Sequence, residues 1–174
     1  MTGGLAAGPT GLRLTQAQRR DWLRLIRSEN VGPRTFRALL NRMGGAAAAL
    51  AALPDLSRKS GKPVRVATLE EIEREMEAAA RIGVAFVAMG EPDYPASLRA
   101  IADAPPLIAV RGQIATLRRP MVAIVGSRNA SAVGLAMAER LAHGLGEAGY
   151  VVVSGLARGV DARAHRASLA RGGV

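Results

Sequence analysis

The sequence predicts an α/β fold in which a small helical domain precedes the first half of a doubly wound parallel sheet. Two apolar runs, residues 121–125 and 150–153, are rich in valine and isoleucine, which is typical of strands buried on both faces. Each run is followed by a turn of small residues and then by a helical pattern. Strand, glycine turn and helix therefore occur twice in succession, which is how a Rossmann-like domain begins.

Three helices are predicted between residues 12 and 53. Thr15 and Gln18 have the spacing of a capping box and open the first helix. The Val31-Gly32-Pro33 segment separates it from the second helix, and Pro54 is expected to stop a short third one. This order is similar to helix-hairpin-helix and SAM-like modules, which contact DNA backbones, although an ordinary helical bundle uses the same turn.

A second capping box, formed by Thr68 and Glu71, opens a further helix. Leu69, Ile72 and Met76 are predicted on the inward face of this helix, and its glutamates mostly point outward. Strands are expected at residues 84–89 and 107–110. We expect these strands to extend the sheet that the two later strands begin.

Three segments are predicted along the chain. Residues 1–11 form a disordered tail rich in glycine and alanine, without the features of a signal peptide. Residues 12–66 form the helical SAM-like domain, which ends in a basic loop, and residues 67–174 form the Rossmann-like domain. No apolar run approaches the ~20 residues that cross a bilayer, and the absence of cysteine fits a reducing cytoplasm.

The two glycine turns are the candidate binding site. At the junction of a strand and a helix, free backbone amides and the positive end of the helix dipole favour an anion. The turns present Arg128 and Arg158, but neither matches Gly-x-Gly-x-x-Gly, and the second strand does not end in an acidic residue. We therefore expect two phosphate-binding turns and no NAD, NADP or FAD. The alternative is that the glycines only permit tight packing of strand and helix.

The charge balance favours a polyanionic partner. The formal net charge is +10, from 24 basic and 14 acidic residues, and nucleic acid is the simplest partner for such an excess. The basic residues are 22 arginines and 2 lysines in a chain rich in alanine and glycine, a bias that also occurs in GC-rich genomes. Arg34 and Arg37, which follow the predicted hairpin, are further candidates for contact with DNA.

The motifs resemble those of the DNA-processing protein A family, also called DprA or Smf. The resemblance rests on residues 124–128, residues 154–161, Ala164-His165 and, upstream, Asp93-Tyr94-Pro95. It implies a cytoplasmic protein that binds and protects single-stranded DNA and loads the RecA recombinase during natural transformation. It also implies that the intact protein is a homodimer. The chain is expected to be an amino-terminal portion of such a protein, because it stops where a third strand should begin.

The resemblance places the DNA pocket on both glycine turns. The residues it implies are Gly126, Ser127 and Arg128 on the first turn, and Ser154, Gly155, Ala157 and Gly159 on the second. Arg158 is a further candidate for the pocket, because the second turn presents it among small residues. Asp161 and His165 lie four residues apart on one helical face, so we expect them to share a hydrogen bond and to support the pocket.

Catalytic and metal-binding patterns are scarce, and we expect no catalytic residue and no metal. Ser154 does not lie in a Gly-x-Ser-x-Gly elbow, and no cluster of metal ligands is visible in the sequence. Two other functions stay open. One is a Rossmann-like enzyme that hydrolyses nucleotide N-glycosidic bonds, and the other is a helical adaptor with a degenerate Rossmann-like remnant.

Overall fold

A computed structural model describes residues 13–59, 61 and 63–170, and it divides the chain into two compact units. Unit 1 comprises Met1–Ile114 and unit 2 comprises Ala115–Val174. The tail expected over residues 1–11 lies outside the described residues. No helix among the described residues is both long and apolar enough to cross a membrane.

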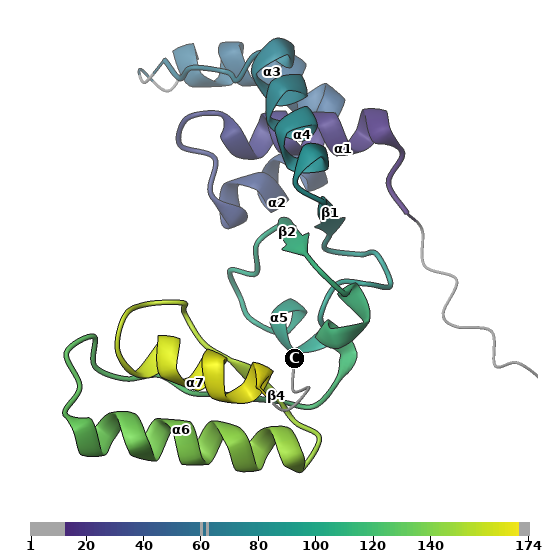
Figure 1. Cartoon of the computed structure of the whole chain (residues 1–174). Helices are drawn as coiled ribbons and strands as arrows, with labels where there is room; N and C mark the ends of the chain where they lie inside the picture. Colours follow the sequence, from purple (N-terminus) through teal and green to yellow (C-terminus); the bar gives the residue numbers. More distant parts are fainter. Residues whose placement is uncertain (1–12, 60, 62, 171–174) are drawn as a thin grey trace, which may run out of the picture. The chain divides into compact units, whose positions relative to one another are not determined.

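Four helices form most of unit 1 (Figure 1). They are α1 (Gln16–Arg27), α2 (Pro33–Met43), α3 (Ala46–Lys59) and α4 (Leu69–Arg81). Both predicted capping boxes are present. The Thr15 hydroxyl accepts a hydrogen bond from the Gln18 amide, and the Thr68 hydroxyl accepts one from the Glu71 amide. The starts of α1 and α4 are therefore fixed by hydrogen bonds between residues three positions apart.

The third helix differs from the prediction, because α3 continues through Pro54 to Lys59. A proline inside a helix removes one backbone hydrogen bond and strains the preceding turn. In α3 this cost is offset by the packing of residues beyond the proline, since Ser57 is buried and Leu56 contacts the hydrophobic core. Part of the predicted basic loop is therefore helical.

The core of unit 1 is built from large aliphatic and aromatic side chains. Its fully buried members include Leu25 and Phe36, and Trp22 packs against them from the edge. The Trp22 and Phe36 rings meet edge to face, with centroids 4.9 Å apart. Of the three residues of α4 predicted to face inward, Ile72 is buried and Met76 packs in the same cluster, whereas Leu69 is 43% exposed.

The prediction that residues 84–89 and 107–110 extend the later sheet is wrong. The two strands, β1 (Val84–Ala88) and β2 (Leu107–Arg111), form a separate antiparallel pair, with the short helix α5 (Ala96–Arg99) between them. Phe86 and Leu107 pack against the buried side chains of α1 and α4, which holds this pair in unit 1. The structure thus divides after Ile114, whereas the sequence placed the domain boundary after residue 66.

Unit 2 has the alternating order that the sequence predicts. A 3-10 helix (Ile114–Arg118) leads into it, and its elements are β3 (Met121–Ala123), α6 (Ala132–Glu147), β4 (Val151–Val153) and α7 (Val160–Leu169). The strands β3 and β4 are parallel, with Met121 opposite Val151. The predicted strand–turn–helix repeat and its parallel sheet are confirmed.

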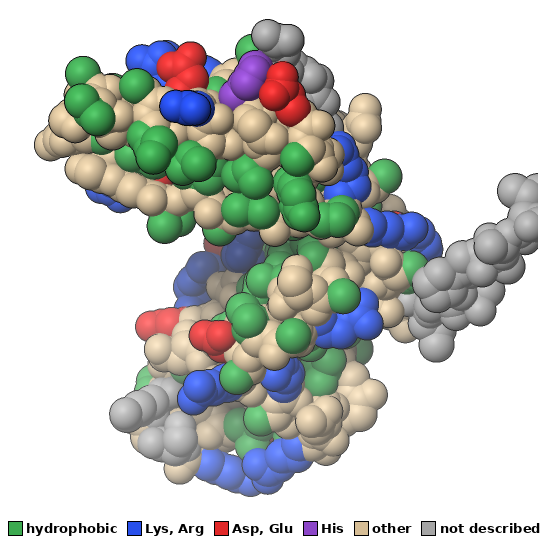
Figure 2. All heavy atoms as spheres, turned by 90° about the horizontal axis from the view of Figure 1, so that it is seen from below, with side chains coloured by type: hydrophobic (Ala, Val, Ile, Leu, Met, Phe, Trp, Pro, Cys, Tyr) green, Lys and Arg blue, Asp and Glu red, His purple; other side chains and the backbone are tan. Residues whose placement is uncertain are grey.

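Burial in unit 2 differs from the prediction. Val125 is 78% exposed, although it belongs to the run predicted to be buried, because the described sheet has only two strands and β3 ends at Ala123. The inward face of α6 includes Ala138 and Ala142, whereas Leu141 is 52% exposed. Figure 2 shows the hydrophobic side chains that gather on the face of unit 2 formed by α6.

Candidate nucleic-acid interface

The two glycine turns lie side by side at the carboxyl ends of β3 and β4. Because the strands are parallel, these ends meet at one edge of the sheet. The Ile124 amide donates to the Val153 carbonyl (2.9 Å), and the Ser154 hydroxyl donates to the Ile124 carbonyl (2.6 Å). These bonds continue the pairing of the strands beyond the sheet and align the starts of the turns.

Two glycines let the turns approach each other closely. The Val160 amide donates to the Ser127 carbonyl (3.2 Å), which joins the start of α7 to the first turn. Gly159 has φ +81°, and a Cβ there would lie 2.2 Å from the Ser127 carbonyl oxygen. A Cβ at Gly126 would lie 2.8 Å from Val160 Cγ2. Both positions therefore require glycine, for reasons of space at each and of backbone conformation at Gly159.

Asp161 and His165 contact the second turn, and no hydrogen bond joins them in the described structure. Asp161 is buried and its Oδ2 accepts a hydrogen bond from the Gly155 amide (3.0 Å). His165 Nε2 lies 3.4 Å from the Ser154 carbonyl oxygen. The expectation of an Asp161–His165 bond is wrong, because each of the two side chains has a backbone group of the turn as its partner.

The first turn is longer than the second, and its helix begins later. The Ser127 hydroxyl accepts from the Asn129 amide (3.1 Å), and the Ser131 hydroxyl accepts from the Gly134 amide (3.2 Å). Ser131 is therefore the N-cap of α6, a role that the sequence interpretation missed. The signal was present, because a serine directly precedes the helical pattern.

Both turns expose hydrogen-bond donors to solvent. Arg128 and Arg158 are exposed, and neither guanidinium makes a hydrogen bond or an ion pair with any described residue. Several backbone amides on each turn also lack a hydrogen bond within the described part of the chain. They include those of Gly126, Ser127 and Arg128 on the first turn and those of Ala157, Arg158 and Gly159 on the second. This set of donors is suited to phosphate oxygens.

An apolar side chain lies on the second turn, between the buried strand and the arginine. Leu156 has φ +55° and is 81% exposed. Val125, before the first turn, is 78% exposed. Exposed apolar side chains beside unpaired cations can contact both the bases and the phosphates of an unpaired strand. The sequence interpretation did not select Leu156, although a leucine among small turn residues was a usable signal.

The predicted contacts near the hairpin of unit 1 have a different environment. The Arg37 guanidinium donates to the carbonyls of Ala102 (2.8 Å) and Ala104 (3.5 Å), so it holds a loop of unit 1 in place. Arg34 is exposed and makes no such bond with the described residues. Among the residues that the structure describes, no group of three or more acidic, histidine or cysteine side chains could hold a metal ion.

Two family models match the chain and together cover most of it. The model described as "DprA-like N-terminal HHH domain" matches residues 16–78. The model described as "DNA recombination-mediator protein A" matches residues 85–174, which is half of the chain. The two matches meet between residues 78 and 85, close to the start of β1.

Individual relatives carry related names. The DNA processing protein DprA of Streptococcus pneumoniae is 46% identical over 80 residues, which is 46% of this chain and 28% of that protein. DprA of Bacillus subtilis is 31% identical over 100 residues, 57% of this chain and 34% of the relative. Protein Smf of Escherichia coli is 38% identical over 81 residues, 47% of this chain and 22% of the relative. The matched segments thus span about a third or less of these proteins.

A solved structure has the same fold. The X-ray structure of DprA from Streptococcus pneumoniae superposes with a TM-score of 0.61 and 25% sequence identity. The superposition covers 93% of this chain and 56% of that chain. The helical region followed by the parallel strand pair is therefore an arrangement that occurs in an experimentally determined protein.

Proposed function

Because the chain belongs to the DNA recombination-mediator protein A family, we propose that it binds single-stranded DNA through the paired turns of unit 2. The observation that supports this most directly is the pair of exposed, unpartnered arginines, Arg128 and Arg158, beside backbone amides without described partners. Arginine binds phosphate with two parallel hydrogen bonds, and the amides add directional donors. The expected ligand is the phosphate backbone, with little preference for base sequence.

The charge of unit 2 supports the same site. Its sequence contains eight arginines and three acidic residues within 60 residues. Asp161, one of these three, is buried against the Gly155 amide and does not face the exposed arginines. Because this carboxylate is engaged in a structural hydrogen bond, it is not free to act as a catalytic acid or base. This favours a role of unit 2 in binding over the alternative, hydrolysis of N-glycosidic bonds.

We further propose that the complete protein works in the cytoplasm, loads RecA onto single-stranded DNA during natural transformation and acts as a homodimer. The names of the relatives, DNA processing protein DprA and Protein Smf, support a role with DNA. RecA loading is measured by the rate of RecA ATP hydrolysis on oligo-dT coated with a single-strand binding protein. An unchanged rate, with DNA binding intact, would contradict the loading role alone.

The DNA site is tested by replacing its arginines. Arg128→Ala is expected to weaken binding of oligo-dT by about 1–3 kcal/mol and to reduce the salt slope by about one, as for the loss of one phosphate contact. Arg158→Ala is expected to act in the same direction with a smaller effect, because Leu156 and the turn backbone remain to contact the strand. Fluorescence anisotropy across a salt series measures both variants.

Arg74→Ala is the matched control. Arg74 is exposed on α4 and pairs with Glu70 (3.5 Å), so its removal takes away one positive charge without touching the turns. Its effect on affinity is expected to be close to zero. If Arg128→Ala stays folded and binds with the affinity and salt slope of the unmodified chain, the assignment of the site to these turns is wrong.

A further inference from the structure

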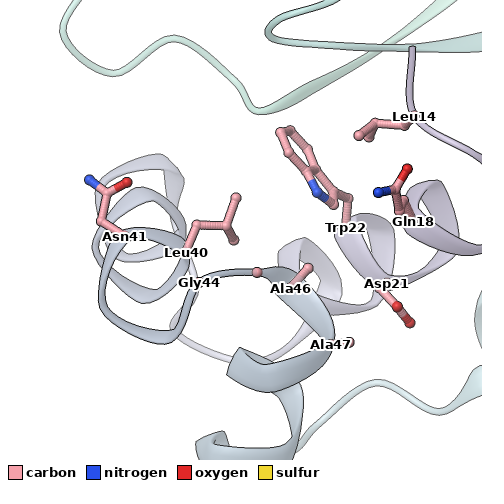
Figure 3. A pocket seen from close by; sticks show the side chains of 10 residues that line it. Leu14, Gln18, Asp21, Trp22, Leu40, Asn41, Gly44, Ala46 and Ala47 are labelled. Carbon is pink, nitrogen blue, oxygen red and sulfur yellow. The ribbon is translucent and has the colours of Figure 1, made fainter. Parts of the chain in front are cut away.

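A cavity of about 510 Å³ lies in unit 1, between α1, α2 and the start of α3 (Figure 3). Trp22 and Leu40 face it from α1 and α2, and Leu14 lies beside the indole ring. These three side chains give the cavity an apolar wall. We name it the Trp22 pocket.

The aromatic wall of the Trp22 pocket is held in a fixed position. The indole ring of Trp22 packs on the buried ring of Phe36, with an interplanar angle of 65° and centroids 4.9 Å apart. An aromatic ring fixed by the core loses little conformational entropy when a ligand covers its exposed face. Half-buried tryptophans of this kind are enriched among the residues that dominate protein–protein binding.

Two consecutive glycines keep the other side of the pocket open. A Cβ at Gly44 or at Gly45 would meet no atom within 4 Å. Gly44 ends α2 in the left-handed conformation, with φ +79°, so the chain turns sharply there without a side chain. The gap between α2 and α3 is therefore not narrowed by a side chain at either glycine.

The charge at the rim of the pocket is opposite to that of the chain. Asp21 lines the pocket and makes no hydrogen bond or ion pair with any described residue. None of the ten lining residues is a lysine or an arginine, although the chain has a net charge of +10. Among these ten residues, Asp21 is thus the one with an acidic or basic side chain, and a carboxylate attracts cations and repels phosphates.

From this geometry we propose that the Trp22 pocket docks a segment of a partner protein that presents an apolar side chain next to an arginine or a lysine. The apolar side chain covers Trp22 and Leu40, and the neighbouring cation pairs with Asp21. Charge complementarity favours a protein over a nucleic acid here, because a DNA strand would bring phosphates toward the carboxylate without any lining cation to bind them. This surface is distinct from the DNA site on unit 2.

The proposal is tested through the fluorescence of Trp22, the only tryptophan of the chain. The probes are the capped peptides Ac-Arg-Leu-Leu-Arg-NH2, Ac-Glu-Leu-Leu-Glu-NH2 and Ac-Arg-Ala-Ala-Arg-NH2, titrated into the full chain. The first peptide is expected to shift the emission of Trp22 to shorter wavelength in a saturable way. The other two are expected to bind about fivefold more weakly or worse, because each lacks one of the two contacts.

Variants of the rim identify the site. Asp21→Asn is expected to weaken binding of the arginine–leucine peptide about threefold to fivefold and to leave the emission of the free chain unchanged. Ala47→Arg, at an exposed position that lines the pocket, places a cation at the rim and is expected to weaken the same peptide at least as much. Asp103→Asn, which removes an exposed carboxylate away from the pocket, is the matched control and is expected to change nothing.

Three outcomes would overturn the proposal. The first is the absence of a saturable change in Trp22 emission with the arginine–leucine peptide. The second is equal binding of the glutamate peptide, which would show that the carboxylate takes no part. The third is a saturable shift with oligo-dT in place of the peptide, which would make the pocket a nucleobase site.

Discussion

The arginines of unit 1 and those on the two glycine turns of unit 2 have different environments. Several arginines of unit 1 pair with carboxylates, as in Arg20–Glu73 (2.9 Å) and Arg27–Glu75 (2.6 Å), and others donate to backbone carbonyls. Much of the positive charge of unit 1 is therefore balanced by other groups of the same unit. In unit 2, Arg163 pairs with Glu139 (3.1 Å) and Arg119 donates to the Gly149 carbonyl (3.0 Å). The two turn arginines, Arg128 and Arg158, make no such contact with the described residues. Net charge therefore indicates a nucleic-acid partner only where the charges remain unpaired.

The glutamates of α4 illustrate the same difference. The sequence interpretation placed them mostly outward, but Glu73 and Glu75 pair with arginines of α1. The hydrogen bonds that Arg27 donates to Glu75 raise the pKa of Arg27, and burial opposes this shift only in part. The acidic face of α4 thus holds two helices together.

The cores differ as well. Unit 1 buries leucine, isoleucine and phenylalanine side chains, whereas the buried cluster of unit 2 consists of Ala142, Val152, Ala164 and Ala167. Small residues let α6 and α7 approach closely but bury little apolar area per residue. The stability of unit 2 therefore depends more on the close approach of its backbone segments. The stability of unit 1 depends more on side-chain packing and on buried ion pairs.

The largest expected effect is at the most buried pair of unit 1. Arg19 donates to both oxygens of Glu91, which is 2% exposed and also accepts from the amides of Leu14 (3.0 Å) and Ala88 (2.9 Å). Arg19→Ala leaves a buried carboxylate without its cation and is expected to lower the free energy of unfolding by about 3–5 kcal/mol. Urea denaturation followed by Trp22 fluorescence measures this loss.

Arg74→Ala serves as the control for that measurement, because its pair with Glu70 is exposed and should contribute about 0–1 kcal/mol. Equal losses for Arg19→Ala and Arg74→Ala would show that the buried position of Glu91 does not matter. The contrast between the two units would then rest on packing alone.

The next effect concerns the backbone fit of unit 2. Gly159→Ala forces a Cβ against the Ser127 carbonyl at a position with φ +81°, and it is expected to destabilise unit 2 by about 2–4 kcal/mol. Gly149→Ala is the matched control, because Gly149 has φ +83° but open space around its Cβ, so about 1–2 kcal/mol is expected. Hydrogen exchange of peptides from residues 151–169 reports both losses.

The two glycine variants separate the cost of a left-handed backbone conformation from the cost of steric overlap at the Cβ position. If they destabilise unit 2 equally, the close approach of the two turns adds nothing beyond the left-handed backbone conformation. Protection of the amides in α1 should stay unchanged in both variants, since unit 1 has its own core.

The smallest effect is the pH dependence of unit 1. Burial alone would raise the pKa of Glu91, but hydrogen bonds from Arg19 and from the amides of Ala88 and Leu14 outweigh it and lower the pKa below 4.5. The resulting stabilisation is complete above the pKa of the unfolded chain and is lost as pH falls through the lower pKa of the folded state. The difference in free energy of unfolding between the unmodified chain and the Glu91→Gln variant should therefore become smaller below about pH 4.5. Urea denaturation at several pH values measures this difference.

If this difference in free energy of unfolding stays constant or grows on acidification, the pairing of an ionised Glu91 with Arg19 is contradicted. The exposed capping residue Glu71 offers a comparison within the same unit. Its pKa is also lowered, by hydrogen bonds from the Thr68 amide and from Arg65, but it lies at the surface, where solvent screens the charge. Glu71→Gln should therefore alter the pH dependence less than Glu91→Gln.

The sequence by itself determined the features that depend on neighbouring residues. The capping boxes at Thr15 and Thr68, the strand–turn–helix repeat and the two glycine turns all follow from hydrogen bonds and conformational preferences within a few positions. The family could be identified for the same reason, since its motifs are these turns. The role of the turn residues in DNA binding stays a prediction.

Only the tertiary structure decided the features that depend on residues far apart in the chain. It paired β1 with β2, extended α3 through Pro54, and gave Asp161 the Gly155 amide as its partner. It also bound Arg37 to backbone carbonyls more than 60 residues away while leaving Arg128 exposed. Composition treats all arginines alike, because the partner that a charged side chain finds is set by which elements pack together.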